Sequence, residues 1–171
     1  MIKPKAKTVV LDNVIIIDFG KLNDDFVLLN KILTGYDVIV TPEVQYEPRI
    51  GMDISKLSFR TEGYTTEDDY IAARKLRGKN KSLSWADISC ITVAKKLKGY
   101  CATNEKLERE TAKAEGVKVI GSLGLLKYAV RKGILSPHKA IEICDIFIAN
   151  GARLDKNVVG SFKYEMRLFK S

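Results

Sequence analysis

Short apolar runs alternate along the chain with longer segments in which apolar residues recur every three or four positions. A short run bounded by turn-forming residues is typical of a buried strand, and the longer spacing is typical of a helix with one buried face. The runs predict four main strands, at residues 8–11, 36–40, 99–103 and 117–120. Because helical segments separate these strands, the pattern predicts an α/β fold with a parallel sheet and right-handed crossovers.

Capping residues mark where several helices begin. Thr41 precedes Pro42, a pair typical of a helix start, and Thr66 precedes three acidic residues that complement a helix dipole. The longest amphipathic helix is predicted to start at Ser84. Further helices are predicted at residues 23–33, 104–115, 122–132, 136–149 and 155–168.

Two segments are left open by the pattern. Residues 12–20, DNVIIIDFG, either extend the first strand or begin a short buried helix. Residues 50–65 are predicted to be an irregular loop with at most a short strand at residues 57–60. The chain shows no repeat, low-complexity tract or linker, and its 171 residues suit one domain.

The composition is ordinary for a soluble globular protein, with 46% hydrophobic and 29% charged residues. No apolar run approaches the roughly 20 residues that a membrane span needs, and no signal-peptide pattern is seen. We therefore expect a cytoplasmic protein with no membrane partner. Cys90, Cys101 and Cys144 are far apart, which predicts buried reduced thiols rather than a zinc site, and His138 is expected at the surface.

Acidic residues follow the predicted strands, at the edge where ligands bind to open parallel sheets. Asp12 follows the first strand, Glu43 and Glu47 follow the second at helical spacing, and Glu105 follows the third. Asp87 lies in the first turn of the long helix. Clustered carboxylates repel and need a counter-charge. Because histidine and cysteine clusters are absent, the fitting cation is one that prefers oxygen, such as Mg²⁺ or Mn²⁺.

Most of these acids also have a purely structural interpretation. Ser84 and Asp87 match a variant capping box, Glu43 complements a helix dipole, and Glu105 fits a solvated helix face. Asp12 is harder to explain, because a carboxylate at the end of a buried strand is costly unless it is paired, hydrogen-bonded or bound to metal.

Five segments, in this order and spacing, resemble the PIN-domain nucleases, the superfamily that includes the VapC-type toxin ribonucleases. They are VVLDN at 9–13, TPEVQYE at 41–47, LSWADIS at 83–89, ATNEKL at 102–107 and VKVIGSLGLL at 117–126. The resemblance implies a three-layer α/β/α fold with a central, mainly parallel sheet of four to five strands. It also implies a single PIN-like domain over residues 1–171, with a helical C-terminal extension at about 133–168.

The resemblance implies a metal-dependent endoribonuclease that hydrolyses phosphodiester bonds in single-stranded RNA. One expected role is the toxin of a toxin–antitoxin pair, so the implied partners are RNA, an antitoxin protein and a second copy in a homodimer. Asp12, Asp87 and Glu105 are the implied ligands of Mg²⁺ or Mn²⁺, and Glu47 is a further ligand or a base that positions water. The supporting residues are Asn13, Ser84, Thr103 and Asn104.

Two positions depart from the family pattern. Family members usually carry Asp where Glu105 stands and a small polar residue where Val14 stands, and Asn104 is a candidate neutral ligand that compensates. These departures keep open the alternative of a PIN module with weak or no catalysis, which binds RNA or a protein partner. A flap-type DNA nuclease ranks last, because the chain lacks an obvious helical-arch insertion.

The segment RKLRGKNK at 74–81 precedes LSWADIS and is strongly basic, in a chain of net charge +8. A basic surface of this kind indicates an anionic partner, most often nucleic acid. The segment is either a phosphate-binding flank of the acidic site or a solvated helix end. The candidate RNA-binding residues are Arg74, Lys75, Arg77, Lys79 and Lys81. Trp85 is expected to pack in the core or at its edge rather than to stack on bases.

Overall fold

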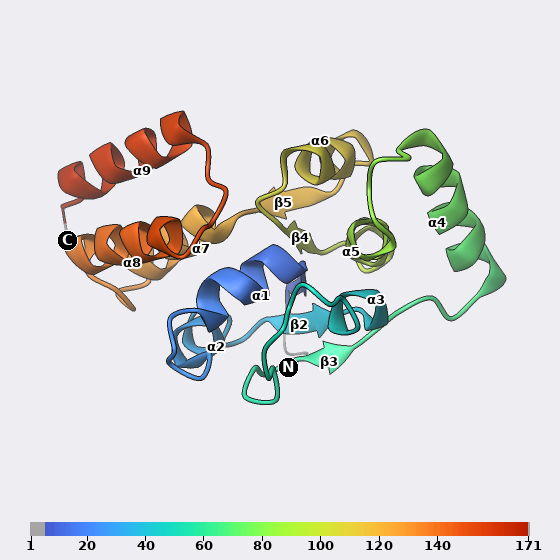
Figure 1. Cartoon of the computed structure of the whole chain (residues 1–171), viewed down its shortest axis with the longest axis horizontal. Coiled ribbons are helices and arrows are strands. Elements are labelled where there is room, and N and C mark those ends of the chain that lie inside the picture. Colours follow the sequence, from blue (N-terminus) through green and yellow to red (C-terminus); the bar gives the residue numbers. More distant parts are fainter. Residues whose placement is uncertain (1–5, 171) are drawn as a thin grey trace, which may run out of the picture.

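The computed structural model describes residues 6–170 (Figure 1). Within them, a parallel sheet of five strands has the order β3-β2-β1-β4-β5. This confirms the predicted fold class and the strand count of four to five. The strands are β1 Thr8–Leu11, β2 Asp37–Val40, β3 Arg60–Thr61, β4 Tyr100–Ala102 and β5 Lys118–Ile120.

Helices cover both sides of this sheet and give a three-layer α/β/α arrangement. On one side α5 packs against β1 and β4, and α6 packs against β5. On the other side lie α1, α2 and α7, and α8 and α9 pack against α7 and each other (Figure 1). The helices are α1 Asn13–Gly20, α2 Val27–Ile32, α3 Pro42–Gln45, α4 Glu67–Lys79, α5 Trp85–Lys96, α6 Lys106–Ala114, α7 Ser122–Arg131, α8 Pro137–Ala149 and α9 Lys156–Leu168.

The centre of the core is β1, whose residues are all buried. Val10 pairs in register with Ile39 on one side and with Cys101 on the other. The segment left open by the sequence pattern is a helix, α1, which buries Phe19 against Phe147 of α8 with the ring centroids 5.1 Å apart. The apolar residues of this segment therefore pack beneath the sheet rather than extend it.

Two predicted helices differ from those observed. The helix predicted at 23–33 begins only at Val27, because Phe26 before it has a left-handed backbone with φ of 61°. The helix after Thr41 ends at Gln45, so Glu47 does not lie on one helix with Glu43. The prediction of a shared helical face is therefore wrong. Glu47 precedes Pro48, and a residue in that position disfavours helical geometry.

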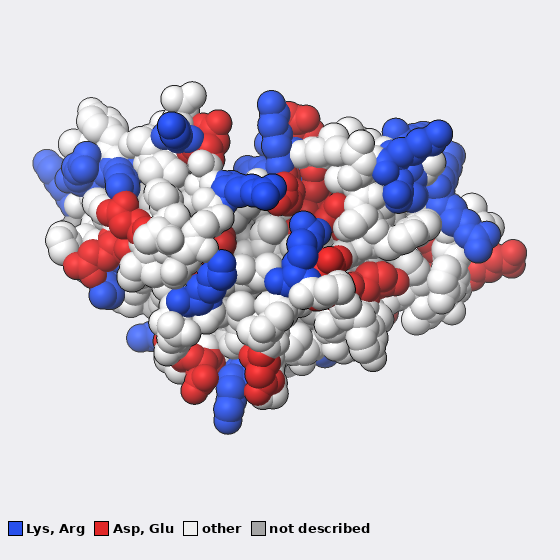
Figure 2. Space-filling view, viewed as in Figure 1, with Lys and Arg blue, Asp and Glu red and all other residues white. Residues whose placement is uncertain are grey.

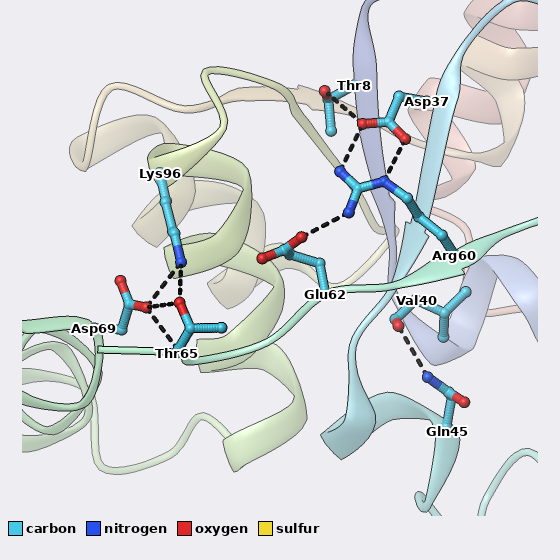
Figure 3. Close-up of polar contacts among 9 residues, drawn as sticks. All are labelled: Thr8, Asp37, Val40, Gln45, Arg60, Glu62, Thr65, Asp69 and Lys96. Carbon is cyan, nitrogen blue, oxygen red and sulfur yellow. Dashed lines mark hydrogen bonds and ion pairs between the residues drawn. The ribbon is translucent and has the colours of Figure 1, made fainter. Parts of the chain in front are cut away.

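The connector from β3 to α4 is held by charged groups at both ends (Figure 3). Arg60 on β3 donates to both carboxylate oxygens of Asp37 on β2, at 2.7 and 2.8 Å. Asp69 in the first turn of α4 accepts from Lys96 at the end of α5, at 2.8 Å. The first contact ties β3 to β2, and the second ties the start of α4 to the end of α5. At the opposite ends of these helices, Arg77 of α4 lies beside Trp85 of α5.

Other sequence predictions concern the surface and the thiols. None of the helices within residues 6–170 is long and apolar enough to cross a membrane. Cys90, Cys101 and Cys144 are free and buried, as predicted. The His138 side chain is 85% exposed and pairs with Glu142 on the same helix, which confirms a surface position.

Candidate metal centre

Three acids from three chain segments lie at the end of β1. Asp12 follows β1 directly, and its backbone N–H donates to the Ala102 carbonyl of β4 at 3.0 Å. Asp87 lies in the first turn of α5, which packs on β1 and β4. Glu108 lies on α6, and both Asp12 and Glu108 are 0% exposed. The sequence pattern identified the first two acids and missed the third.

Burial, and then mutual repulsion, raise the pKa values of the two buried acids. Burial, and then the charge of Asp87, raise the pKa of Asp12 from 3.8 to about 6. Burial and then the charge of Asp12 raise the pKa of Glu108 well above its usual value, with a smaller contribution from Asp87. A bound cation would relieve this repulsion.

Thr103, at the exit of β4, connects the two buried carboxyl groups. Its hydroxyl donates to Asp12 Oδ2 at 3.1 Å, and its oxygen lies 2.6 Å from Glu108 Oε2. The Cys101 thiol donates to Glu108 Oε1 at 3.4 Å. The other oxygen of Asp12, Oδ1, is buried and has no hydrogen-bond partner within the part of the chain that the structure describes. That oxygen is available to a ligand.

The donor atoms fit a hard divalent cation. Asp12, Cys90 and Glu108 each present one ligand atom, and these atoms lie within 4.8 Å of one another. Cys90 is the poor member of this group, because burial raises the pKa of its thiol and the thiol donates to the Leu11 carbonyl at 3.7 Å. The useful donors are therefore carboxylate oxygens. Mg²⁺ and Mn²⁺ prefer such oxygen ligands, whereas Zn²⁺ also binds nitrogen and sulfur ligands.

Asp87 forms the predicted capping box with Ser84. The Ser84 hydroxyl accepts from the Asp87 N–H at 3.1 Å, and Asp87 Oδ2 accepts from the Ser84 N–H at 2.7 Å. The capping role therefore occupies one carboxylate oxygen of Asp87. Among residues 6–170 no hydrogen bond engages its Oδ1, so the same side chain has an oxygen left for a cation.

A family model described as a PIN domain matches residues 8–167. The chain belongs to the PIN-domain family. This confirms the family expected from the sequence, and it suggests a nuclease whose buried acids hold a metal ion. No curated protein sequence matches the chain closely enough to count as a relative.

In this PIN domain Glu105 begins α6 without a side-chain capping bond. Its side chain is partly exposed and lines a groove along α6. Within the described residues, no hydrogen bond joins its carboxylate to Asp12. Glu108 lies one helical turn further on and takes the buried position. Glu105 and Glu108 lie at positions i and i+3 of the segment EKLE at 105–108, and this spacing was the sequence signal that could have revealed Glu108.

Asn104 is engaged at both ends of its carboxamide. Its Nδ2 donates to Asp18 Oδ2 at 2.8 Å and to Ser122 Oγ at 2.9 Å, and its Oδ1 accepts from the Ser122 N–H at 2.9 Å. Asn104 therefore ties the exit of β4 to α1 and α7 and sets the path of the chain just before Glu105. Next to Asp12, Asn13 is 1% exposed and its Nδ2 has no partner within residues 6–170.

Arg49 is a cation near the acids that the sequence pattern did not suggest. Its Nε donates to Glu47 Oε1 at 3.2 Å. Burial lowers the pKa of Arg49, but the Glu47 contact and the charges of Asp87 and Asp12 outweigh this effect and raise it. The guanidinium therefore lies in the field of the acidic centre, where it holds Glu47. No motif in the sequence distinguishes this arginine from a surface one.

The basic segment 74–81 ends beside the start of α5. The Arg77 guanidinium lies 5.8 Å from the centroid of the Trp85 ring and donates to the Lys81 carbonyl. Trp85 is 49% exposed, so it stands at the edge of the core with one face accessible. The other basic side chains of the segment are exposed, and Lys and Arg gather on the surface over α4 (Figure 2).

Proposed function

We propose that this PIN-domain protein is a metal-dependent endoribonuclease that uses Mg²⁺ or Mn²⁺ to hydrolyse phosphodiester bonds in single-stranded RNA. The observation that carries the proposal is the Oδ1 of Asp12, which has no hydrogen-bond partner within residues 6–170 and is buried near the carboxyl groups of Asp87 and Glu108. A buried carboxylate oxygen without a donor is costly unless it serves a ligand.

Asp12, Asp87 and Glu105 would hold the cation, which would supply an activated water and charge stabilisation at the scissile phosphate. Thr103 orients Asp12 by donating to Oδ2, and within residues 6–170 this leaves Oδ1 without a hydrogen-bond donor. The Ser84 N–H orients Asp87 in the same way. Glu108 would support the site through Thr103, whose hydroxyl also contacts Asp12. Such supporting contacts fix ligand geometry and typically matter almost as much as the ligands.

Glu47 would position the attacking water or bind a second cation, with Arg49 setting its orientation. Arg49 would also offset negative charge on an incoming phosphate, because it already lies in the field of Asp12 and Asp87. The candidate strand-binding residues belong to the basic segment that ends beside the start of α5, where Trp85 offers a ring for a base. They are Arg74, Lys75, Arg77, Lys79 and Lys81.

The biological setting proposed for this activity is the cytoplasm, as the toxin of a toxin–antitoxin pair. Support comes from the family resemblance and from the net charge of +8, which suits a nucleic-acid substrate. An antitoxin protein and a homodimer partner remain part of this proposal. The same fold with the same acids would also serve a module that binds RNA without cutting it.

The deciding experiment incubates the protein with a mixed pool of single-stranded RNA in Mn²⁺, in Mg²⁺ and in EDTA. We expect cleavage with either metal and none in EDTA. The control is Asp12→Asn, because it removes the charge of the central ligand and keeps its size. Cleavage that persists in Asp12→Asn would mean a contaminating nuclease. If the wild type binds RNA without cleaving it, the proposed function becomes that of an RNA-binding module rather than a nuclease.

A further inference from the structure

A groove runs along α6 between this helix, α7 and the start of α9. It has a volume of about 870 Å³, within the size range of ligand sites. Glu105 and Asn104 line it, so it opens next to the candidate metal centre. Figure 2 shows the outline notched between α9 and α6, with Lys and Arg side chains on both sides of the notch.

The groove carries an excess of positive charge. The cations that line it come from α6, from α7 and from the loop before α9, and they are Lys106, Arg109, Lys113, Lys127 and Arg153. Three acids line it as well. Of these, Glu110 lies 3.9 Å from Lys106, and Asp155 caps α9 by accepting from the Asn157 N–H at 2.8 Å. Within residues 6–170, Lys113 and Arg153 are exposed and form no ion pair.

The rest of the lining does not offer a stacking surface. It consists mainly of aliphatic side chains and glycine, and its aromatic residue, Phe162, is 1% exposed. A base binds to such proteins chiefly by stacking on an aromatic ring, whereas a phosphate binds to lysine and arginine. The groove therefore suits a sugar–phosphate backbone better than it suits splayed bases.

We propose that this groove binds the backbone of the RNA strand on one side of the scissile bond, with Lys113 and Arg153 contacting phosphates. The inference rests on the proposed function, because it assumes an RNA substrate at the acids. Trp85 is the first residue of α5 and the basic segment 74–81 ends beside it, so the strand would pass from there across the acids into the groove. An acidic protein segment has a similar charge, but it gives no reason for the groove to open at the metal centre.

Phosphate contacts by Lys113 and Arg153 would make RNA binding depend on salt. Each phosphate contact to a single strand contributes about −0.7 to the slope of log affinity against log salt, so two contacts contribute about −1.4. Because the contacts are to the backbone, their loss should weaken binding to all sequences alike. Any preference for an RNA sequence should then come from contacts between bases and Trp85.

The experiment measures binding of a short fluorescent oligoribonucleotide to the metal-free protein by anisotropy at several salt concentrations. It compares the double variant Lys113→Glu/Arg153→Glu with the control Lys31→Glu/Arg167→Glu. Both pairs exchange one exposed lysine and one exposed arginine, and the control residues lie outside the groove lining. Melting temperatures equal to wild type establish that both variants are folded.

We expect the groove variant to lose at least about tenfold in affinity relative to the control and its salt slope to be less steep by about 1.4. Equal RNA affinity in the two variants overturns the groove proposal. If the wild type nevertheless cleaves RNA in Mn²⁺, the proposed nuclease function is unaffected. If the groove variant loses RNA affinity but the wild type does not cleave RNA, the groove proposal is supported and the proposed nuclease function is overturned. A wild type that neither binds nor cuts RNA overturns both.

Discussion

Thr103 Oγ1 lies 2.6 Å from Glu108 Oε2, so one threonine hydroxyl contacts both buried carboxyl groups of the acidic centre. The same threonine oxygen also contacts Asp12 Oδ2 at 3.1 Å and accepts from the Glu105 N–H at 3.2 Å. A hydroxyl has one proton to donate and two lone pairs to accept with. All three contacts are satisfied together when a protonated Glu108 donates to Thr103 and Thr103 donates to Asp12. The raised pKa of Glu108, caused first by burial, agrees with this arrangement.

The first prediction follows from a neutral Glu108. Glu108→Gln keeps a donor toward Thr103 and an acceptor for the Cys101 thiol, so it should cost less than about 1 kcal/mol in the free energy of unfolding. Glu108→Ala leaves a cavity and unpaired polar groups, and it should cost about 2–4 kcal/mol. Urea unfolding of both variants without metal tests this. Equal losses in the two variants would mean that Glu108 is ionised.

The second prediction concerns pH. Burial raises the pKa of Asp18 to about 6, although hydrogen bonds from Ser122 and Asn104 oppose the shift. At pH values between the ordinary pKa of 3.8 and about 6, Asp18 is protonated in the folded protein and ionised in the unfolded chain. The stability of the metal-free protein should therefore fall as the pH rises from about 4 to about 6, and Asp12 should act in the same direction.

The variant Asp18→Asn isolates this effect, because it removes the titrating group and keeps an acceptor for Ser122. The fall in unfolding free energy between about pH 4 and pH 7 should be smaller in the variant by an amount on the order of 2 kcal/mol. Urea unfolding in EDTA at several pH values provides the measurement. Parallel stability curves for wild type and Asp18→Asn would contradict the raised pKa.

The sequence predicted the sheet and most helices because their signals are local. The helix at α5 has a capping residue and a regular apolar spacing, and the fold keeps both: Ser84 caps the helix, and Ile88 and Ile91 are buried. The start of α2 was mispredicted because Asn23 and Asp25 adopt left-handed turns that resemble a helix start in sequence. Propensity alone does not separate a cap from a turn at such residues.

The candidate site was predictable only in part, because its members meet through tertiary packing. Asp12 was evident from the sequence, because a carboxylate at the end of a buried strand is costly unless it is paired, hydrogen-bonded or bound to metal. Glu108 looked like one charged residue among many in a polar helix, and in the fold its carboxyl group contacts Cys101 of β4 and Thr103 just after that strand. Arg49 is placed beside the acids by an irregular loop, for which the sequence carries no periodic signal.

The third prediction separates capping from metal binding at the start of α5. Ser84→Ala should cost about 1 kcal/mol of stability and leave the cleavage rate within a fewfold of wild type. Asp87→Asn keeps an oxygen that accepts from the Ser84 N–H, so it should cost less than that. Its cleavage rate should nevertheless fall by more than about 100-fold, since losing a ligand exceeds the 10–100-fold cost typical of losing a supporting contact. A normal rate in Asp87→Asn would limit this residue to capping.

The fourth prediction concerns Glu105, where the family pattern has the shorter Asp. A carboxylate misplaced by about 1 Å can cost on the order of 100-fold in rate, so Glu105→Asp should increase metal-dependent cleavage of RNA by roughly tenfold or more. The substitution has a second effect, because Glu105 begins α6 without a capping bond and Asp is a preferred N-cap. Part of any gain would then come from a more stable helix rather than from a better ligand.

Glu105→Ser distinguishes these two effects, since serine also caps a helix but carries no charge. Both variants should stabilise α6 by about 0.5–1 kcal/mol in urea unfolding. Only Glu105→Asp should raise the cleavage rate, and its gain should be greater in Mg²⁺, which demands near-ideal octahedral geometry, than in the more tolerant Mn²⁺. If Glu105→Ser cleaves RNA as fast as Glu105→Asp, the carboxylate at this position does not bind the catalytic metal, and Glu108 becomes the third acid of the site.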